Sequence, residues 1–382
     1  MKKVLSVFGT RPEVIKLAPV MLLLDSNPQF DHIKCATGQH RELLDDALKA
    51  FNISPDIDLD IMTQDQSLYS LASSVILGLG EVIGREKPDV VLVHGDTTTS
   101  MGASLAAFYC GAPVAHVEAG LRTHDLRAPF PEELNRQITG KIARWHFAPT
   151  EKARQNLLAE GTSDNRIWVT GNTVVDALNL TIKRLDNDGL LRDQIGASLD
   201  ASIGHASHEN PLVLITGHRR ENFDGGLSRI CEAIRILALA YPAVTFVYSV
   251  HPNPNVMSMV QSKLSGLGNV RLVHALAYLD FVSIMNMCLF ILTDSGGIQE
   301  EALVLRKPVL VLRDKTERSE GLSAGGAKLV GSKTEEIVLE ATKLLENRSD
   351  VAVQELDRWA YGDGFAAGRI ISELMHHLGT TN

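Results

Sequence analysis

Ionisable side chains lie at or just after the ends of three stretches of the sequence that predict buried β-strands. Asp96 follows DVVLVHG, Glu118 lies in PVAHVEAG, and His218 follows PLVLITG. Each could be structural, with Asp96 capping the helix TTSMGASLAAF and Glu118 pairing with Arg122. Because parallel sheets bind ligands at the carboxyl ends of their strands, the convergence of these groups favours a catalytic cluster that transfers protons.

A further pair of carboxylates lies in the segment PFPEELNR. Glu132 and Glu133 follow Pro131, whose position suits a first helical turn. We expect one of the two carboxylates to balance the positive end of the helix dipole and the other to face a ligand cleft.

The loop after the first strand, GTRPE, has the residue types of an anion site. Thr10 and Glu13 form the T-x-x-E pattern of a capping box, with Pro12 in the first turn. Arg11 and Lys16 then lie near a helix N-terminus, which favours anions. Taken alone, these two cations are equally compatible with a solvated surface pair.

The segment CLFILTDSGGIQEEA predicts a second anion site. Ser295, Gly296 and Gly297 follow a buried strand and open a helix, so backbone amides could approach a phosphate closely. Glu301, one turn later, could receive the hydroxyl pair of a ribose. A tight strand-to-helix turn without a ligand is the alternative.

The elements that must position these residues alternate along nearly the whole chain, which predicts parallel sheets covered by helices on both faces. The predicted strands of the first half are 4–9, 33–37, 89–95, 113–120, 145–150 and 166–171, and those of the second half are 211–217, 245–250, 269–275, 288–294 and 307–313. A connecting helix near 172–185 and a polar surface excursion over 186–210 separate the halves. We therefore expect a first domain over 1–170 and a second over 171–364, with a C-terminal helix within 365–382.

Composition excludes several classes of protein. The chain has 382 residues and a formal net charge of -9, so a nucleic-acid partner is not expected, although a small diphosphate can still bind to a few local cations and amides. No apolar run approaches the ~20 residues of a membrane-spanning helix, and MKKVLSVFG predicts a first strand rather than a signal peptide. The four cysteines are widely spaced without a CxxC pair, which favours buried thiols in a reducing cytoplasm over disulfides or a zinc site.

Several common motifs are missing from the sequence. The first strand is not followed by GxGxxG, and GLGEVIG at 78–84 lies in a helical stretch. A Walker loop, HExxH and GxSxG are also absent from the sequence. We therefore expect no nicotinamide cofactor and no metal.

Nine segments, in order along nearly the whole chain, together resemble the non-hydrolysing UDP-N-acetylglucosamine 2-epimerase family: GTRPE, TGQHRELL, HGDTTT, HVEAGLRT, PFPEELNR, WHFAPT, VTGNTVVDAL, TGHRREN and DSGGIQEEA. The resemblance implies two Rossmann-like domains with a central cleft, the glycosyltransferase B architecture, in which the C-terminal helix returns to the first domain. It also implies a homodimer.

The resemblance implies a role for individual residues. The positions that match the family's catalytic set are Asp96, Glu118, Glu132 and His218. The positions that match its UDP-binding set are Arg11, Lys16, Ser295, Gly296, Gly297, Glu301 and Arg318, and Phe281 is expected near the uracil.

The implied reaction is reversible epimerisation at carbon 2 of UDP-N-acetylglucosamine, which supplies the synthesis of surface polysaccharides. No carbonyl adjoins this carbon, so its proton is not acidic enough for simple exchange. Without a dinucleotide motif, elimination of UDP to 2-acetamidoglucal and re-addition on the other face is the consistent path. The anion sites would stabilise the leaving diphosphate and the carboxylates would move the proton.

The sequence departs from the family pattern near the expected uracil site. Leu276 stands where glutamine is usual, EALVLR places Leu303 in a changed segment, and Ser319 replaces a proline. These departures leave open the contacts to the nucleobase and the identity of the sugar.

Some members of the family bind a second UDP-N-acetylglucosamine as an activator. The residues that fit this neighbourhood are Gln39, His40, Arg219 and His251. Glu42 stands where those members often have glutamine. A sigmoid dependence of rate on substrate concentration is the kinetic property that such a site would produce.

Four alternative functions share most of these features. They are a related UDP-aminosugar epimerase, a hydrolysing 2-epimerase, a UDP-sugar glycosyltransferase of the same fold, and a nucleotide-sugar sensor without catalytic activity. Fold alone does not separate them, because function belongs to the site.

Overall fold

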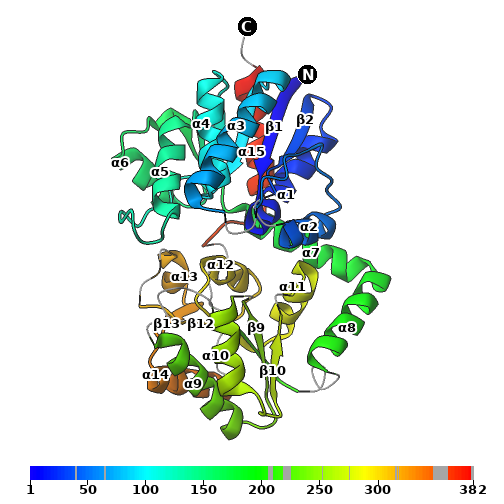
Figure 1. The fold of residues 1–382 in the computed structure, drawn as a ribbon, viewed down its shortest axis with the longest axis vertical. Coiled ribbons are helices and arrows are strands. Elements are labelled where there is room, and N and C mark those ends of the chain that lie inside the picture. The colour runs from blue at the N-terminus through cyan, green and yellow to red at the C-terminus, as the bar shows by residue number, and fades with distance from the viewer. Residues whose placement is uncertain are drawn as a thin grey trace. The chain divides into compact units, whose positions relative to one another are not determined.

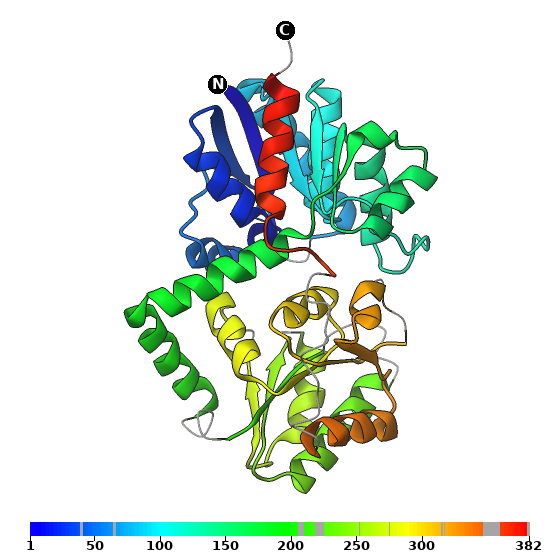
Figure 2. The same cartoon turned by 180° about the vertical axis from the view of Figure 1, so that it is seen from behind.

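The computed structural model describes residues 1–38, 41–63, 66–204, 210–217, 225–251, 253–274, 276–314, 316, 318–346 and 360–379. The chain forms two compact units, which are shown in Figures 1 and 2. Unit 1 consists of Met1–Leu180 and Tyr361–Asn382, and unit 2 consists of Thr181–Ala360. Within the described ranges, no helix is long and apolar enough to cross a membrane.

Unit 1 is built on a seven-stranded parallel sheet with the order β3-β2-β1-β4-β5-β6-β7. Its strands are β1 (Lys2–Phe8), β2 (Phe30–Ala36), β3 (Ile57–Asp58), β4 (Val90–His94), β5 (Val114–Val117), β6 (Trp145–Ala148) and β7 (Ile167–Val169). Its helices are α1 (Arg11–Ser26), α2 (Arg41–Ala50), α3 (Leu68–Glu86), α4 (Thr98–Tyr109), α5 (Glu132–Ile142), α6 (Glu151–Ala159), the 3-10 turn η1 (Asp164–Arg166), the first part of α7 (Thr173–Asn187), and α15 (Ala366–Gly379). Helices cover both faces of the sheet, α3 and α4 in front in Figure 1 and α15 in front in Figure 2.

Unit 2 repeats the same architecture with a six-stranded parallel sheet of order β10-β9-β8-β11-β12-β13. Its strands are β8 (Leu212–Gly217), β9 (Thr245–Val250), β10 (Val270–Val273), β11 (Phe290–Thr293), β12 (Val309–Val311) and β13 (Ala327–Leu329). Its helices are the remainder of α7, α8 (Gly189–Ile203), α9 (Gly226–Ala240), α10 (Pro254–Leu264), α11 (Tyr278–Met287), α12 (Gly296–Val304), α13 (Ser319–Ser323) and α14 (Thr334–Glu346).

The apolar runs predicted from the sequence are the strands of the structure, with ends that differ by up to a few residues. The central strands β4 and β8 are buried along their whole length, as expected for parallel strands covered on both faces. The predicted fold class, two doubly wound α/β units, is confirmed.

Three elements differ from the sequence-based expectation. The predicted polar excursion over 186–210 is wrong for its first part, because α8 occupies Gly189–Ile203. Asp188 caps this helix by accepting the amide of Leu191 at 3.0 Å, and Ile195, Leu199 and Ile203 are buried along one face. The short strands β3 and β13 were not predicted, because their sequences, ID and AKL, contain no continuous apolar run.

Helix α15 packs on α1 within unit 1. Asp176 of α7 holds its first turn by accepting the amides of Ala366 and Ala367 at 3.3 and 2.9 Å. The resemblance implied that the C-terminal helix returns to the first domain, and the sequence ended that domain near 170, where β7 ends. The first part of α7 also belongs to unit 1.

Three buried histidines lie on neighbouring strands of unit 1: His94 on β4, His116 on β5 and His146 on β6. Burial lowers the pKa of His94 to about 4, that of His116 to about 3 and that of His146 to about 4. These imidazoles are therefore neutral in the folded chain at pH values where they are protonated in the unfolded chain.

Acid is expected to destabilise this unit below the ordinary histidine pKa of ~6.5, because the unfolded chain then binds protons that the folded chain does not. Each histidine removes up to ~1.4 kcal/mol of stability per pH unit as the pH falls from ~6.5 toward its folded pKa. Urea unfolding at pH 7, 6 and 5 measures this slope. The variant His146→Gln should have a smaller slope than the wild type. Equal slopes in His146→Gln and the wild type would show that this imidazole is not the cause.

Candidate active site

Glu118 is the most constrained candidate of unit 1. It follows β5 directly, is 9% exposed, and has a φ of 61°, a left-handed conformation that is rare for glutamate. Its Oε2 accepts from Nζ of Lys16, in a buried ion pair, and from Nδ2 of Asn172 at 2.9 Å. The predicted structural alternative, a pair with Arg122, is wrong, because the Arg122 guanidinium binds both carboxylate oxygens of Glu160 at 2.7 and 2.9 Å.

His94 lies beside this ion pair. Its Nε2 is 3.9 Å from Oε2 of Glu118. Burial lowers its pKa most strongly, the charges of Glu118 and Asp96 raise it, and the charge of Lys16 lowers it. Lys16, Asp96 and Glu118 therefore act electrostatically on one buried imidazole, and the structure brings these three predicted residues together.

Asp96 follows β4 and is held by α5. Arg136 donates from Nη2 to its carboxylate, and Asn135 donates from Nδ2 to its backbone carbonyl at 3.0 Å. The alternative role of Asp96 as a helix cap is wrong, because Thr97 is the N-cap of α4 and accepts the amide of Ser100 at 3.0 Å. The side chain of Asp96 is 28% exposed, so it remains accessible to a ligand.

The two carboxylates of PFPEELNR have different surroundings. Glu133 is buried and accepts the backbone amides of Thr123 and His124 at 3.0 and 3.1 Å, and it also faces Arg136 at 3.4 Å. Glu132 is partly exposed, and its buried Oε2 has no hydrogen-bond partner among the described residues. The structure thus gives Glu133 a structural role and leaves Glu132 as the member of the pair available for chemistry.

The predicted capping box is present at the start of α1. Oε2 of Glu13 accepts from the amides of Gly9 and Thr10 at 2.9 and 2.8 Å, and Oε1 accepts from the hydroxyls of Thr97 and Ser100 at 2.6 and 3.1 Å. Burial raises the pKa of Glu13. This carboxylate ties the loop after β1, which leads to Arg11 and Lys16, to the loop after β4, which carries Asp96.

In unit 2, α12 opens directly behind β11, as the sequence predicts. Ser295 is the N-cap residue, and its amide donates to the hydroxyl of Thr293 at 3.0 Å. A Cβ built on Gly297 would meet no atom within 4 Å, so the packing of the chain does not require a glycine there. The first turn of α12 is therefore open at a helix N-terminus, where a phosphate group could approach the backbone.

The loop before α13 is tied to the same helix. Arg318 is buried and donates from Nε to Glu300 at 2.9 Å, and its amide donates to Thr316 at 3.1 Å. The Thr316 hydroxyl in turn donates to Gln299 at 3.1 Å. The buried Glu301 thus lies on α12, which the Ser-Gly-Gly turn opens, and Arg318 lies on the loop that is hydrogen-bonded to this helix.

The remaining predicted residues of unit 2 have simpler surroundings. Phe281 is partly buried on α11. Leu276 and Leu303, two departures from the family pattern, are 7% and 1% exposed and therefore contribute to packing. His251 is exposed, and its Nδ1 accepts the amide of Asn253 at 3.2 Å. The predicted residues His218, Gln39, His40 and Arg219 lie outside the described residues, as does the side chain of Ser319.

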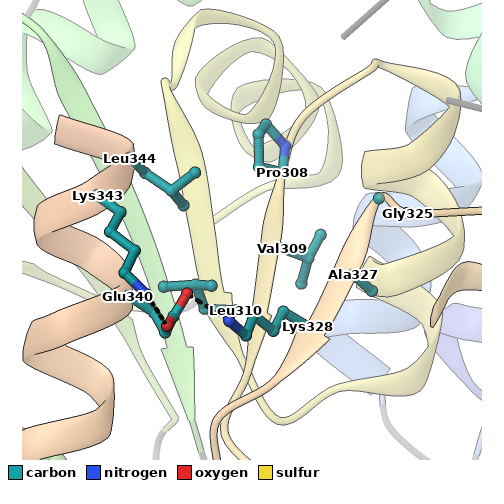
Figure 3. A pocket seen from close by; sticks show the side chains of 10 residues that line it. Pro308, Val309, Leu310, Gly325, Ala327, Lys328, Glu340, Lys343 and Leu344 are labelled. Carbon is teal, nitrogen blue, oxygen red and sulfur yellow. Dashed lines mark hydrogen bonds and ion pairs between the residues drawn. The ribbon is translucent and has the colours of Figure 1, made fainter. Parts of the chain in front are cut away.

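A pocket of about 240 Å³ lies at the other end of unit 2's sheet (Figure 3). It is lined by Pro308 and Val309 at the amino end of β12, by the residues that begin β13, and by α14. Glu340 pairs there with Lys328 and Lys343, at 2.7 Å each. Because ligands of parallel sheets bind at the carboxyl ends of strands, we do not assign this pocket to the active site.

The sequence did not indicate Arg136 and Asn172, which donate hydrogen bonds to the carboxylates of Asp96 and Glu118, or His94, which lies beside Glu118. Asn172 lies just after the end of β7, at a strand end like those that carry Asp96 and Glu118, and its sequence position could therefore have indicated it. Arg136 is one turn after Glu132 on α5, the spacing that places two residues on one face of a helix. No group of three or more His, Cys, Asp or Glu side chains within the described ranges is arranged to hold a metal ion.

The chain has two Rossmann-like units. The first carries carboxylates at its strand ends, and in the second a helix that begins with two glycines follows a strand end. These features define an α/β protein of the glycosyltransferase B class. The sequence model of UDP-N-acetylglucosamine 2-epimerase matches residues 23–375. The chain belongs to the UDP-N-acetylglucosamine 2-epimerase family and is thus related to isomerases.

Individual relatives match over almost their whole length. The UDP-N-acetylglucosamine 2-epimerase of Yersinia pestis is 50% identical over 98% of this chain and 99% of its own, and that of Escherichia coli K12 is 48% identical over the same shares. The crystal structure of the UDP-GlcNAc 2-epimerase from Neisseria meningitidis bound to UDP-GlcNAc has a TM-score of 0.92 at 46% identity, and covers 98% of this chain and 100% of that chain.

Proposed function

We propose that this chain interconverts UDP-N-acetylglucosamine and UDP-N-acetylmannosamine by inverting carbon 2 of the sugar, without hydrolysis. The observation that carries the proposal is the buried Glu118 at the end of β5, held by Lys16 and Asn172 in a chain of this family. A carboxylate whose orientation is fixed by donors is suited to take a proton from a substrate carbon.

The proposed chemistry is an elimination followed by an addition. A carboxylate takes the proton from carbon 2, the bond from carbon 1 to the UDP oxygen breaks, and the electron pair of the C–H bond forms the double bond of 2-acetamidoglucal. UDP then adds back to carbon 1 while a carboxylic acid delivers a proton to the other face of carbon 2. Glu118, Asp96 and Glu132 are the groups available for these transfers, and His218 is assigned to the sugar or the diphosphate by the resemblance.

Unit 2 supports the departure of UDP in this proposal. The diphosphate would bind to the amides that open α12 at Ser295, Gly296 and Gly297, with cationic support from Arg318. A preorganised anion site of this kind stabilises charge that develops on a leaving group. Glu301 would bind the ribose, and Phe281 would lie near the uracil.

Incubation with UDP-N-acetylglucosamine in deuterium oxide, followed by NMR, tests the proposal. We expect deuterium at carbon 2 of both UDP-sugars with no acceptor present, because the eliminated proton is replaced from solvent. A glycosyltransferase or a sensor would leave carbon 2 protiated, and a hydrolysing epimerase would release free N-acetylmannosamine with UDP. Epimerisation of a different UDP-aminosugar alone would correct the substrate and keep the reaction.

We also propose that the chain acts as a homodimer in the cytoplasm and supplies the synthesis of surface polysaccharides, as the resemblance implies. Unit 1 offers a surface for a second copy on α3 and α4, which pack against each other. Large apolar side chains are exposed there, Tyr69 and Leu77 on α3 and Phe108 and Tyr109 on α4, with exposed fractions of 64% to 80%. Exposed apolar groups on two packed helices could form part of a protein interface.

A further inference from the structure

Asn172 makes one hydrogen bond to the fold and another to the catalytic candidate. Its Oδ1 accepts the amide of Val174 at 3.0 Å, which caps the start of α7. Its Nδ2 donates to Oε2 of Glu118 at 2.9 Å. The residue is 2% exposed, so both ends of the amide are fixed inside unit 1.

The backbone of Asn172 is bound to the segment through which the chain re-enters unit 1. Its amide donates to the carbonyl of Tyr361 at 2.7 Å. The backbones of Gly171 and Gly362 lie against each other: a Cβ on Gly362, whose φ is 120°, would lie 3.0 Å from the Cα of Gly171. The position of Asn172 therefore depends on the course of the returning chain.

We propose that Asn172 is a positioning residue for Glu118, and that the contact with Tyr361 and Gly362 sets the orientation of the Glu118 carboxylate through it. This inference rests on the proposed function, in which Glu118 moves a proton. Lys16 contributes charge to Glu118, but its flexible side chain leaves the angle of the carboxylate weakly defined. The amide of Asn172 is short and fixed at its other end, so it defines that angle.

The side chain at position 172 must donate a hydrogen bond to the Glu118 carboxylate and accept one from the Val174 amide. The side-chain amide of asparagine makes both hydrogen bonds without charge, from two different atoms. Aspartate would keep the cap on α7 but would place a second carboxylate oxygen against Oε2 of Glu118. Serine also caps helices well, but its hydroxyl is one atom too short to make both contacts. These two variants therefore separate the structural role of Asn172 from its positioning role.

The test compares Asn172→Asp and Asn172→Ser by kcat, KM and pH profile in the epimerisation assay. We expect kcat to fall ~10- to 100-fold at pH 8 in both variants, with KM within ~3-fold of wild type, because the reacting groups are misaligned while binding is retained. In Asn172→Asp the loss should become smaller toward pH 6, as a proton shared by the two carboxylates restores a donor. The loss in Asn172→Ser should not depend on pH.

The charged groups around Glu118 do not produce this pH effect by themselves. His94 has a pKa of about 4 and stays neutral from pH 6 to 8, and Lys16 is present in both variants. Thermal unfolding is the stability control. Asn172→Ser is expected to stay close to the wild type, since serine can still cap α7. Asn172→Asp buries a second carboxylate beside Glu118 and should unfold at a lower temperature at pH 8 than at pH 6.

A further variant changes the segment around Gly362, through which the chain re-enters unit 1, and leaves Asn172 and Glu118 unaltered. Gly362→Ala should lower kcat with little change in KM, because the new Cβ displaces the Gly171–Asn172 backbone. The matched control is Asp363→Asn, which breaks an exposed ion pair with Arg369 in the same segment and should leave kcat unchanged.

Two results would overturn the inference and leave the proposed function intact, provided that the wild-type enzyme incorporates deuterium. The first is a kcat within ~2-fold of wild type in both Asn172→Asp and Asn172→Ser. The second is a loss of kcat in Asn172→Asp that does not change with pH. A wild-type chain that incorporates no deuterium at carbon 2 would instead remove the proposed function.

Discussion

Replacing Glu118 with glutamine is expected to lower the rate of epimerisation by about 10³-fold. Glutamine has the shape of glutamate and can still accept from Asn172, but it does not take up a proton at neutral pH. General acid–base groups contribute typically ~10²- to 10⁴-fold, so the loss should fall in that range. Turnover of UDP-N-acetylglucosamine and deuterium incorporation at carbon 2 should fall together, because both depend on the same proton transfer.

The same substitution leaves Lys16 buried opposite a neutral side chain. Removing one partner of a buried ion pair costs about 3–5 kcal/mol, so Glu118→Gln should also unfold more easily. The double variant Lys16→Met with Glu118→Gln removes both charges and serves as the control. We expect it to recover much of the lost stability but none of the activity. Recovery of activity in the double variant would show that Glu118 acts only through stability.

Replacing Gly297 with leucine is the second large effect that we expect, and it concerns binding rather than stability. The position of Cβ is open within the chain, and leucine favours a helix more than glycine does, so the free energy of unfolding should stay within ~1 kcal/mol of wild type or rise. A leucine side chain would occupy the space through which a diphosphate reaches the first turn of α12. We expect the affinity for UDP, measured by calorimetry, to fall at least ~100-fold, since the anion loses its amide donors.

Gly196 on α8 provides a matched control for this substitution. It lies in the same unit, is helical, and a Cβ there also meets no atom within 4 Å. Gly196→Leu should leave UDP binding unchanged. Unchanged UDP affinity in Gly297→Leu would show that the diphosphate does not bind at the opening of α12, and would move the nucleotide site elsewhere.

Residue order alone is enough to predict the alternation of strands and helices, the two doubly wound units, the capping box at Thr10 and Glu13, and the family. These features are local or periodic: burial on both faces makes strands such as β4 continuously apolar, and a helix start has a short signature. The strand-end positions of Asp96 and Glu118 follow from the same local patterns. The motif order that identifies the family is likewise a property of the linear chain.

The partners that hold these groups become apparent only in the folded chain. Lys16 and Glu118 are 102 residues apart, Asn172 and Glu118 are 54 apart, and Arg136 and Asp96 are 40 apart. Such pairs form because the sheet order places β1, β4 and β5 side by side and lets α5 and the start of α7 reach their carboxyl ends. Strand order leaves no periodic trace in the sequence, because side-chain patterns report which face of a strand is buried and not which strand lies beside it.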